Sequence, residues 1–113
     1  MGETLTLSNE KRAYTLTDRA TWLAQKSRLP DLTVLVGGNS IKENADAANL
    51  FNPYGVIPVN PARHPRVNAD LGEKFAQWIT SLETQQLIAS YGLDKYGQSL
   101  FIPSSDAWKK AHP

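Results

Sequence analysis

The chain of 113 residues has the length of one ordinary domain, and 41% apolar with 20% charged residues argues against intrinsic disorder. Twelve Lys and Arg residues against eleven Asp and Glu give a formal charge of +1, with neither half strongly charged. This balance argues against a dedicated nucleic-acid binder and against a polybasic membrane anchor. Because there is no cysteine, a disulfide framework, a Cys-based metal site and a thiol nucleophile are excluded.

The apolar runs of the sequence are short. The longest, such as 34–36, cannot span a bilayer. Residues 1–5 have neither the basic head nor the apolar run of a signal peptide. If the protein acts outside the cytoplasm, we expect its export signal to lie on sequence not present in this chain.

In the first third of the chain, two helices and two strands are predicted in alternation. Residues 3–12 predict a short amphipathic helix with Leu5 facing inward. Residues 13–17, rich in aromatic and β-branched types, predict a strand. Thr and Asp at the end of that strand predict the N-cap of a helix over 18–28, which a Leu-Pro pair ends. Residues 32–36 predict a buried strand.

The middle of the chain is less regular. Residues 40–52 are compatible with a short helix or an irregular loop. Residues 56–61 predict an extended segment, with Pro58 indicating an edge strand. The segment 63–66 is a basic loop between prolines, for which a solvated role is the simplest interpretation.

The last part of the chain predicts two strong helices and two short elements. Asn68 predicts the cap of a helix with apolar residues at helical spacing. Ser81 predicts the start of the next helix, and Gly92 its end. Residues 100–102 predict a short strand, and 107–110 a terminal turn or helix. Alternating strands and helices indicate an α/β fold, although so few short strands make a small parallel sheet.

Catalytic signatures are missing from the sequence. It contains no phosphate-loop, dinucleotide-binding or esterase-elbow motif. His64 is a lone histidine in a proline-rich loop, where a surface role is commoner than a role as base or ligand. We therefore expect no enzyme, no cofactor, no catalytic residue and no metal site.

One cluster of residues could hold an anion. Residues 14–21 place hydroxyl groups and Arg19 where a predicted strand ends and a helix begins. Ligands of open α/β sheets bind at such strand ends, and a helix start offers N–H donors to an anion. The alternative is structural, with Thr17 and Asp18 capping the helix and Arg19 pairing with a surface carboxylate. Local sequence alone favours this alternative.

Several stretches resemble the tungstate-binding proteins, the solute receptors of tungstate ABC importers. The stretches that carry the likeness are 1–5 (MGETL), 13–21 (AYTLTDRAT), 50–61 (LFNPYGVIPVNP), the helix pair with 78–81 (WITS), and 97–103 (GQSLFIP). The resemblance extends over nearly the whole chain. Its helix pair is typical of periplasmic binding proteins in general.

The resemblance implies an α/β fold of the type II periplasmic-binding-protein class, present here only as the C-terminal half of a two-lobed protein. Residues 1–52 would be the later part of the second lobe. Residues 53–113 would cross the hinge and complete the first lobe. The sheet partners and a Thr/Ser-rich anion-binding loop would belong to the half that is missing here, which would explain the shortage of strands.

The implied ligand is a tetrahedral oxyanion, tungstate with molybdate as a second candidate, held by hydroxyls and backbone N–H groups. In the family, the start of the MGETL helix presents N–H groups to the anion. The ligand-binding residues that the resemblance implies are Gly2, Glu3, Thr15, Thr17, Arg19 and Tyr54.

The resemblance also implies partners and a location. An ABC transporter permease would be the partner, outside the cytoplasm in the periplasm or the extracellular space, with membrane contact only through that permease. The unpaired strands suggest a homodimer that exchanges elements between two copies. The alternative function is the ligand-sensing effector domain of a transcriptional regulator with the same fold.

Overall fold

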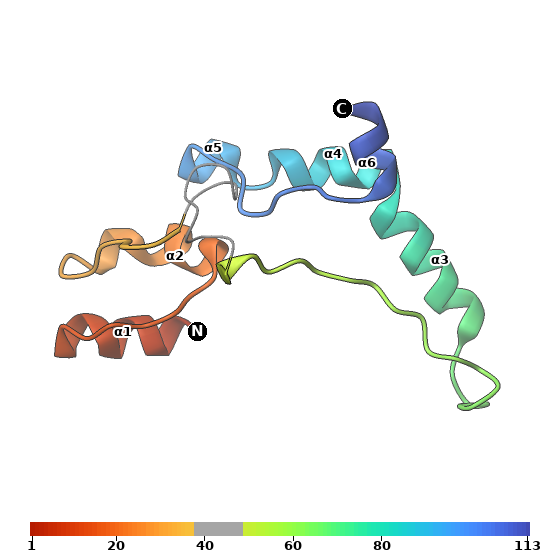
Figure 1. Ribbon diagram of the computed structural model, residues 1–113, viewed down its shortest axis with the longest axis horizontal. Helices are drawn as coiled ribbons and strands as arrows, with labels where there is room; N and C mark the ends of the chain where they lie inside the picture. The colour runs from red at the N-terminus through yellow and green to blue at the C-terminus, as the bar shows by residue number, and fades with distance from the viewer. Residues whose placement is uncertain (38–48) are drawn as a thin grey trace. The chain divides into compact units, whose positions relative to one another are not determined.

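A computed structural model describes residues 1–37 and 49–113, which belong to two compact units, Met1–Gly55 and Val56–Pro113. The helices among the described residues are α1 (Gly2–Lys11), α2 (Arg19–Gln25), the 3-10 turn η1 (Lys26–Arg28), α3 (Ala69–Thr80), α4 (Leu82–Ser90), α5 (Leu93–Tyr96) and α6 (Asp106–Ala111) (Figure 1).

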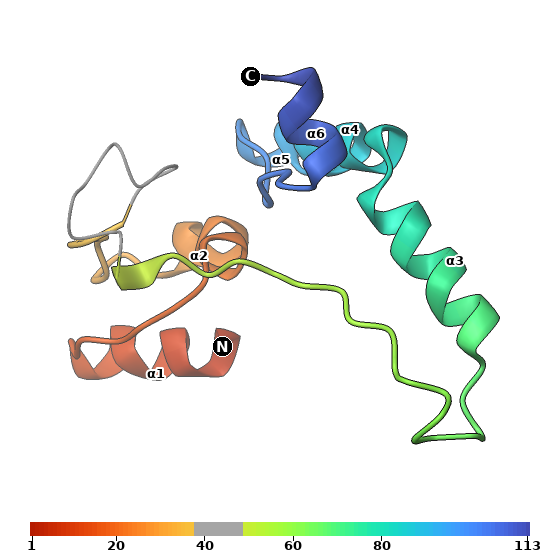
Figure 2. The ribbon, with the colours of Figure 1, turned by 45° about the vertical axis from the view of Figure 1, so that its right-hand side comes forward.

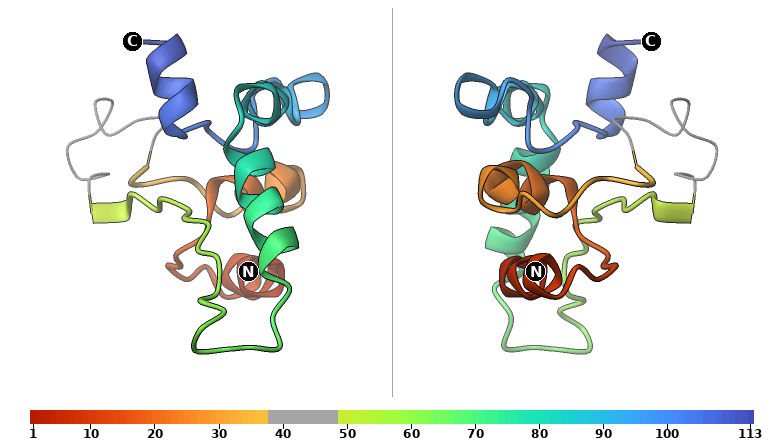
Figure 3. Two further views of the ribbon diagram at one scale, coloured as in Figure 1. Left: turned by 90° about the vertical axis from the view of Figure 1, so that its right-hand side faces the viewer. Right: turned by 90° about the vertical axis from the view of Figure 1, so that its left-hand side faces the viewer.

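In the first unit, α1 and α2 lie side by side and run in the same direction (Figures 2 and 3). They do so because segment 12–18 runs back along α1 before α2 begins (Figure 1). Further along the chain, the Asp31 N–H donates to Asn9 Oδ1 at 2.9 Å, which fixes the end of η1 against the end of α1. The helices predicted at 3–12 and 18–28 are thereby confirmed.

The core of this unit is small and apolar. Leu5 of α1 is 2% exposed, and Leu23 and Leu29 from the α2–η1 stretch are also buried. Leu5 therefore faces inward as predicted, on the side of α1 that packs against α2. These three leucines are the buried apolar side chains among the described residues.

The strands predicted at 13–17, 32–36 and 100–102 are wrong for this structure, and the extended segment 56–61 does not act as an edge strand. The described residues contain no strand, so the α/β class is not confirmed. An apolar, β-branched segment becomes a strand only when a neighbouring chain pairs with its backbone and covers one face. Among the described residues no segment does so. The ambiguous stretch 40–52 lies mostly outside the described residues.

In the second unit, the prediction of two helices that meet at Ser81 is confirmed. Ser81 ends α3 and caps α4, and its Oγ accepts the Thr84 N–H at 3.3 Å. Asn68 caps α3 by accepting the Leu71 N–H at 3.1 Å. Gly92 follows α4 with a φ of 92°, and a Cβ there would lie 2.8 Å from Leu100 Cγ. Glycine is thus required for both its conformation and its lack of a side chain.

A buried glutamine attaches the C-terminal segment to α4. Gln85 is 7% exposed, and its Nε2 donates to the Ile79 carbonyl at 2.9 Å. Its Oε1 accepts the N–H groups of Ser104 and Ser105 at 2.9 and 3.1 Å. The chain beyond α5 consequently returns along α4 to α6 (Figure 1), so the turn or helix predicted at 107–110 is a helix.

Candidate functional site

The start of α1 is the first feature that could bind a ligand. Its N-cap residue, Met1, makes no side-chain capping hydrogen bond. The N–H groups of the first turn of a helix have no acceptor within that helix, and the helix dipole gives them a partial positive charge. A hollow of about 600 Å³ lies beside this turn, lined by Met1, Gly2, Glu3, Thr6, Gln25, Arg28 and Leu29.

Gly2 lies directly against α2. A Cβ on Gly2 would overlap the side-chain amide nitrogen of Gln25. A larger residue at this position would therefore require the Gln25 side chain to rotate away from the start of α1. The absence of a side chain at Gly2 lets the amide of Gln25 come close to the N–H groups that open α1.

The hollow combines neutral donors with charges of both signs. The Gln25 amide and the first-turn N–H groups are neutral donors, and the Arg28 guanidinium is a cation. Glu3 adds a carboxylate in the first turn, where the helix dipole favours it. An anion bound here would meet the N–H dipoles and the Arg28 guanidinium, and also the Glu3 residue that lines the same hollow.

The two threonines predicted for the site lie in the segment between α1 and α2. Thr15 is exposed and Thr17 is half-buried. Each hydroxyl donates to the carbonyl of the following residue, at 3.4 Å in both cases. These long contacts are weak, so both hydroxyls can turn to another acceptor at little cost.

The start of α2 differs from the start of α1 because Asp18 occupies it. Asp18 Oδ1 accepts the Thr21 N–H and Oδ2 accepts the Thr21 hydroxyl, both at 2.7 Å. Burial alone would raise the pKa of Asp18, but the hydrogen bonds from Thr21 outweigh it, and the pKa is lowered. The N-cap predicted at 17–18 is thus Asp18, which places a carboxylate next to Arg19, the first residue of α2.

The six predicted site residues are only partly brought together. Gly2 and Glu3 line the same hollow. Thr15, Thr17 and Arg19 lie outside its lining, and Tyr54 is 74% exposed in the extended segment at the end of the first unit.

The other polar residues of the hollow, Thr6, Gln25 and Arg28, were not predicted from the sequence. Gln25 and Arg28 are three residues apart, a spacing that places two side chains on one helix face. This spacing indicates a ligand site only when it is known that α2 packs on the first turn of α1. No local motif connects Gln25 with Gly2.

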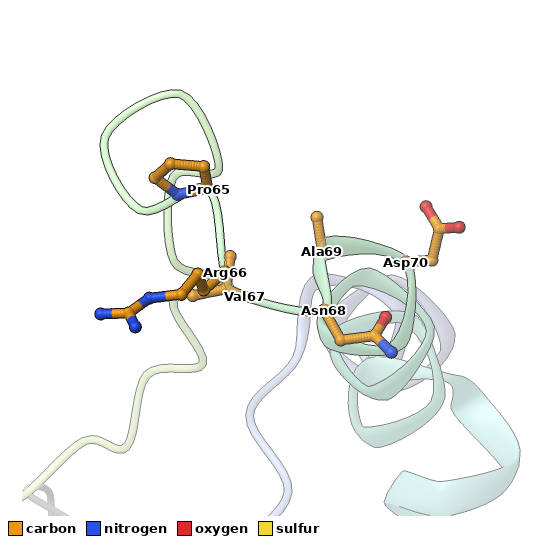
Figure 4. Close-up of a pocket in the computed structure, with 6 residues that line it drawn as sticks. All are labelled: Pro65, Arg66, Val67, Asn68, Ala69 and Asp70. Atoms are coloured by element: carbon orange, nitrogen blue, oxygen red, sulfur yellow. The ribbon is translucent and has the colours of Figure 1, made fainter.

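A second hollow, of about 470 Å³, lies at the start of α3 and is lined by residues 65–70 (Figure 4). Asn68 uses its side chain to cap the helix, and the side chains of Arg66 and Asp70 point in different directions (Figure 4). The basic loop 63–66 overlaps this lining at Pro65 and Arg66. It follows a turn in which the Arg63 and His64 N–H groups donate to the Asn60 carbonyl. The arrangement indicates a turn and a helix cap.

Residues 1–37 and 49–113 hold no group of three or more His, Cys, Asp or Glu side chains placed to bind a metal ion. None of their helices is long and apolar enough to cross a membrane.

Comparison with known proteins places the chain in a family. The model of the PBP superfamily domain matches residues 1–83. Because this match covers most of the chain, the chain belongs to the PBP superfamily. The coarse fold class expected from the sequence, that of the periplasmic binding proteins, is supported, whereas its α/β sheet and two lobes are not seen in the described residues.

Individual relatives are more specific than the superfamily model, and they confirm the likeness to tungstate-binding proteins. The chain is 42% identical to the tungstate-binding protein TupA of Peptoclostridium acidaminophilum over 93% of its own length and 34% of that protein. It is also 42% identical, over 93% of its length and 29% of the relative, to a putative ABC transporter anion-binding protein of Haloferax volcanii. TupA of Campylobacter jejuni is 32% identical over 77% of the chain and 30% of the relative.

The chain spans about a third of the length of these curated relatives. Their names describe binding proteins and not enzymes, which agrees with the family expected from the sequence. No solved structure matches the chain.

Proposed function

We propose that the chain provides part of the ligand site of an oxyanion-binding protein that serves an ABC importer, with tungstate or molybdate as ligand. The observation that carries this proposal is 42% identity, along 93% of the chain, to a protein named as tungstate-binding. The uncapped start of α1 supports it, because it offers donors to an anion in a hollow large enough for one.

In this proposal, the N–H groups of Gly2 and Glu3 donate to the oxyanion. Neutral donors suit a dianion, since they satisfy its oxygens without burying an unpaired protein charge. The Gln25 amide and the Arg28 guanidinium, which line the same hollow, add donors from α2 and η1. Selectivity then depends on the size of the cavity and on the number of donors.

A second group of residues would complete the site from other elements. Thr15 and Thr17 would donate their hydroxyls, and Arg19 and Tyr54 would line the opening. This assignment requires the weak hydroxyl contacts of the two threonines to be exchanged for contacts to the ligand. Residues 1–52 would belong to one lobe, and residues 53–113 would cross to the other and complete it.

The location and the partner follow from the proposed role. The protein would work in the periplasm or the extracellular space and deliver its ligand to an ABC transporter permease. Its contact with the membrane would be only through that permease. No redox or hydrolytic chemistry is needed for this role.

Nuclear magnetic resonance titration of the ¹⁵N-labelled full chain tests the proposal, because it detects weak as well as tight binding at each backbone amide. We expect tungstate to shift the amide signals of Gly2 and Glu3 saturably, and sulfate and phosphate to shift them less. Molybdate is the fourth anion titrated. If all four anions shift the amide signals equally, and mainly at exposed lysines, a specific oxyanion site is contradicted.

A pair of matched variants tests whether Thr15 belongs to the site. Thr15→Val should weaken tungstate binding roughly 10- to 100-fold, because a hydrogen bond to a charged group contributes about 1.5–3 kcal/mol. Thr33→Val is the control, since Thr33 is likewise exposed in an extended segment. Equal affinities of the two variants would remove Thr15 from the site.

A further inference from the structure

The basic loop 63–66 concentrates basic side chains at one place in the second unit. Arg63, His64 and Arg66 occur within four residues, and all three are exposed. The sequence contains no acidic residue from position 60 to position 69. The Arg66 side chain extends away from α3 (Figure 4). Among the described residues, neither arginine forms an ion pair, so the loop presents two cations to solvent.

Backbone hydrogen bonds hold the loop in one conformation. The N–H groups of Arg63 and His64 donate to the Asn60 carbonyl at 3.2 and 3.0 Å. Asn60 Oδ1 accepts the Ala62 N–H at 2.9 Å, and the His64 carbonyl accepts the Val67 N–H at 3.1 Å. A proline precedes Ala62 and another follows His64, and each fixes its own φ. A partner that binds this loop would therefore order little additional backbone.

The other cations of the second unit have local electrostatic roles. Lys74 lies one turn after Asp70 on α3, a spacing at which opposite charges attract each other. The Lys95 ammonium lies 5.3 Å from the centre of the Tyr96 ring. The two lysines of α6 lie in its last turn, where the helix dipole favours positive charge. The arginines of the basic loop have no comparable role among the described residues.

The number and type of the charges indicate the class of partner. An arginine guanidinium binds a carboxylate through two parallel hydrogen bonds, so a few arginines suffice for an acidic protein surface. Electrostatic binding to anionic lipids uses clusters of about four to eight basic residues, more than this loop carries. Nucleic-acid binding needs an extended positive surface, whereas the whole chain has a formal charge of +1. An acidic protein surface therefore fits best.

We propose that the basic loop 63–66 is a contact for an acidic surface of another protein, whose carboxylates pair with Arg63 and Arg66. The His64 ring supplies a further hydrogen-bonding group at the same contact. Because the loop is small, the contact is weak by itself, and its main effect is on the rate of association and on its salt dependence. The inference does not depend on which anion the first unit binds.

Nuclear magnetic resonance of the ¹⁵N-labelled full chain tests the proposal, with a hexa-aspartate peptide as the probe. We expect the peptide to shift the backbone amide signals of residues 62–66 and the side-chain Nε–H signals of Arg63 and Arg66 saturably. Raising the salt concentration from about 20 to about 200 mM should remove most of the shift, because salt screens exposed charges.

Matched double variants show whether the loop carries the binding. Arg63→Gln with Arg66→Gln should weaken peptide binding roughly fivefold or more, with unchanged circular dichroism because both side chains are exposed. Lys109→Gln with Lys110→Gln removes the same charge from the same unit and should have little effect. Arg63→Lys with Arg66→Lys keeps both charges and should recover part of the affinity.

Three outcomes would overturn the inference. The first is a peptide titration at low salt that leaves the signals of the loop unmoved. The second is equal weakening by the arginine-to-glutamine pair and the lysine-to-glutamine pair, which would mean that net charge alone attracts the peptide. The third is binding of the chain to phosphatidylglycerol vesicles at about 200 mM salt that is lost in the arginine-to-glutamine variant, which would assign the loop to a lipid surface.

Discussion

The two units bury different kinds of side chain. In the first, three leucines from α1, α2 and the residue after η1 are buried, Leu5 almost completely, together with one polar residue, Ser8. In the second, the side chains below a tenth exposed are Thr84 and Gln85, while the large apolar residues of α3 remain in solvent. The first unit is therefore the one with a buried apolar cluster, whereas the buried side chains of the second unit are polar and hydrogen-bonded.

This difference indicates which kind of substitution should destabilise each unit. Apolar contact is non-directional and depends on the area removed from water. Hydrogen bonds inside a unit contribute modestly when made, but a buried group left without its partner is costly. Each unit should accordingly respond to a different class of substitution, and three predictions test this contrast, beginning with the largest effect.

Leu5→Ala should lower the free energy of unfolding by about 3 kcal/mol, because it removes apolar contact and leaves a cavity between α1 and α2. Leu7→Ala is the matched control, since Leu7 lies on the same helix and is 55% exposed. Urea unfolding followed by circular dichroism compares the two. If both substitutions cost the same, α1 is not held by Leu5.

Gln85→Ala should cost about 2 kcal/mol, because it removes a buried side chain whose amide oxygen accepts the part-buried N–H groups of Ser104 and Ser105. The neighbouring Gln86→Ala replaces an exposed residue of the same type and should cost little. Hydrogen exchange gives a second measurement. The amides of Ser104 and Ser105 should exchange faster in Gln85→Ala only, and unchanged rates would show that another contact holds the C-terminal segment.

Asp18→Ala should give the smallest of the three effects, about 1 kcal/mol, which is typical for the loss of an N-cap. The lowered pKa of Asp18 adds a pH dependence. The folded state binds this proton less readily than the unfolded state, so the contribution is present above pH ~4 and is lost as the pH falls further.

Asp18→Asn separates the cap from the charge. The asparagine oxygen can still accept the Thr21 N–H, so most of the capping should remain, while the acid-dependent component should vanish. Stability measured between pH 6 and pH 2 compares the variants. An unchanged acid slope in Asp18→Asn would assign that slope to other carboxylates.

The helices were predictable because their signals are local. Asp18, Asn68 and Ser81 each cap a helix with their own side chain, as their positions in the sequence indicate. Inward-facing Leu5 followed from helical periodicity. Each of these features depends on residues within one or two turns, which a single sequence contains in full.

The strands and most of the site depend on contacts that the sequence does not contain. A strand such as the one predicted at 32–36 requires a neighbour, and its β-branched residues report only that such a neighbour would be favourable. The contact of Gly2 with Gln25 depends on how α2 packs on α1. Residues like Arg28 and Gln25 therefore become candidates only after the helices are placed.

The buried amide of Gln85 has a practical consequence for handling the protein. Its two acceptor contacts reach Ser104 and Ser105, whereas the last residues of the chain are exposed. An affinity tag joined after Pro113 should be tolerated, since it displaces nothing that Gln85 holds. A truncation before Ser104 would instead leave the carbonyl oxygen of that amide without either donor, and shortened versions should be designed to retain both serines.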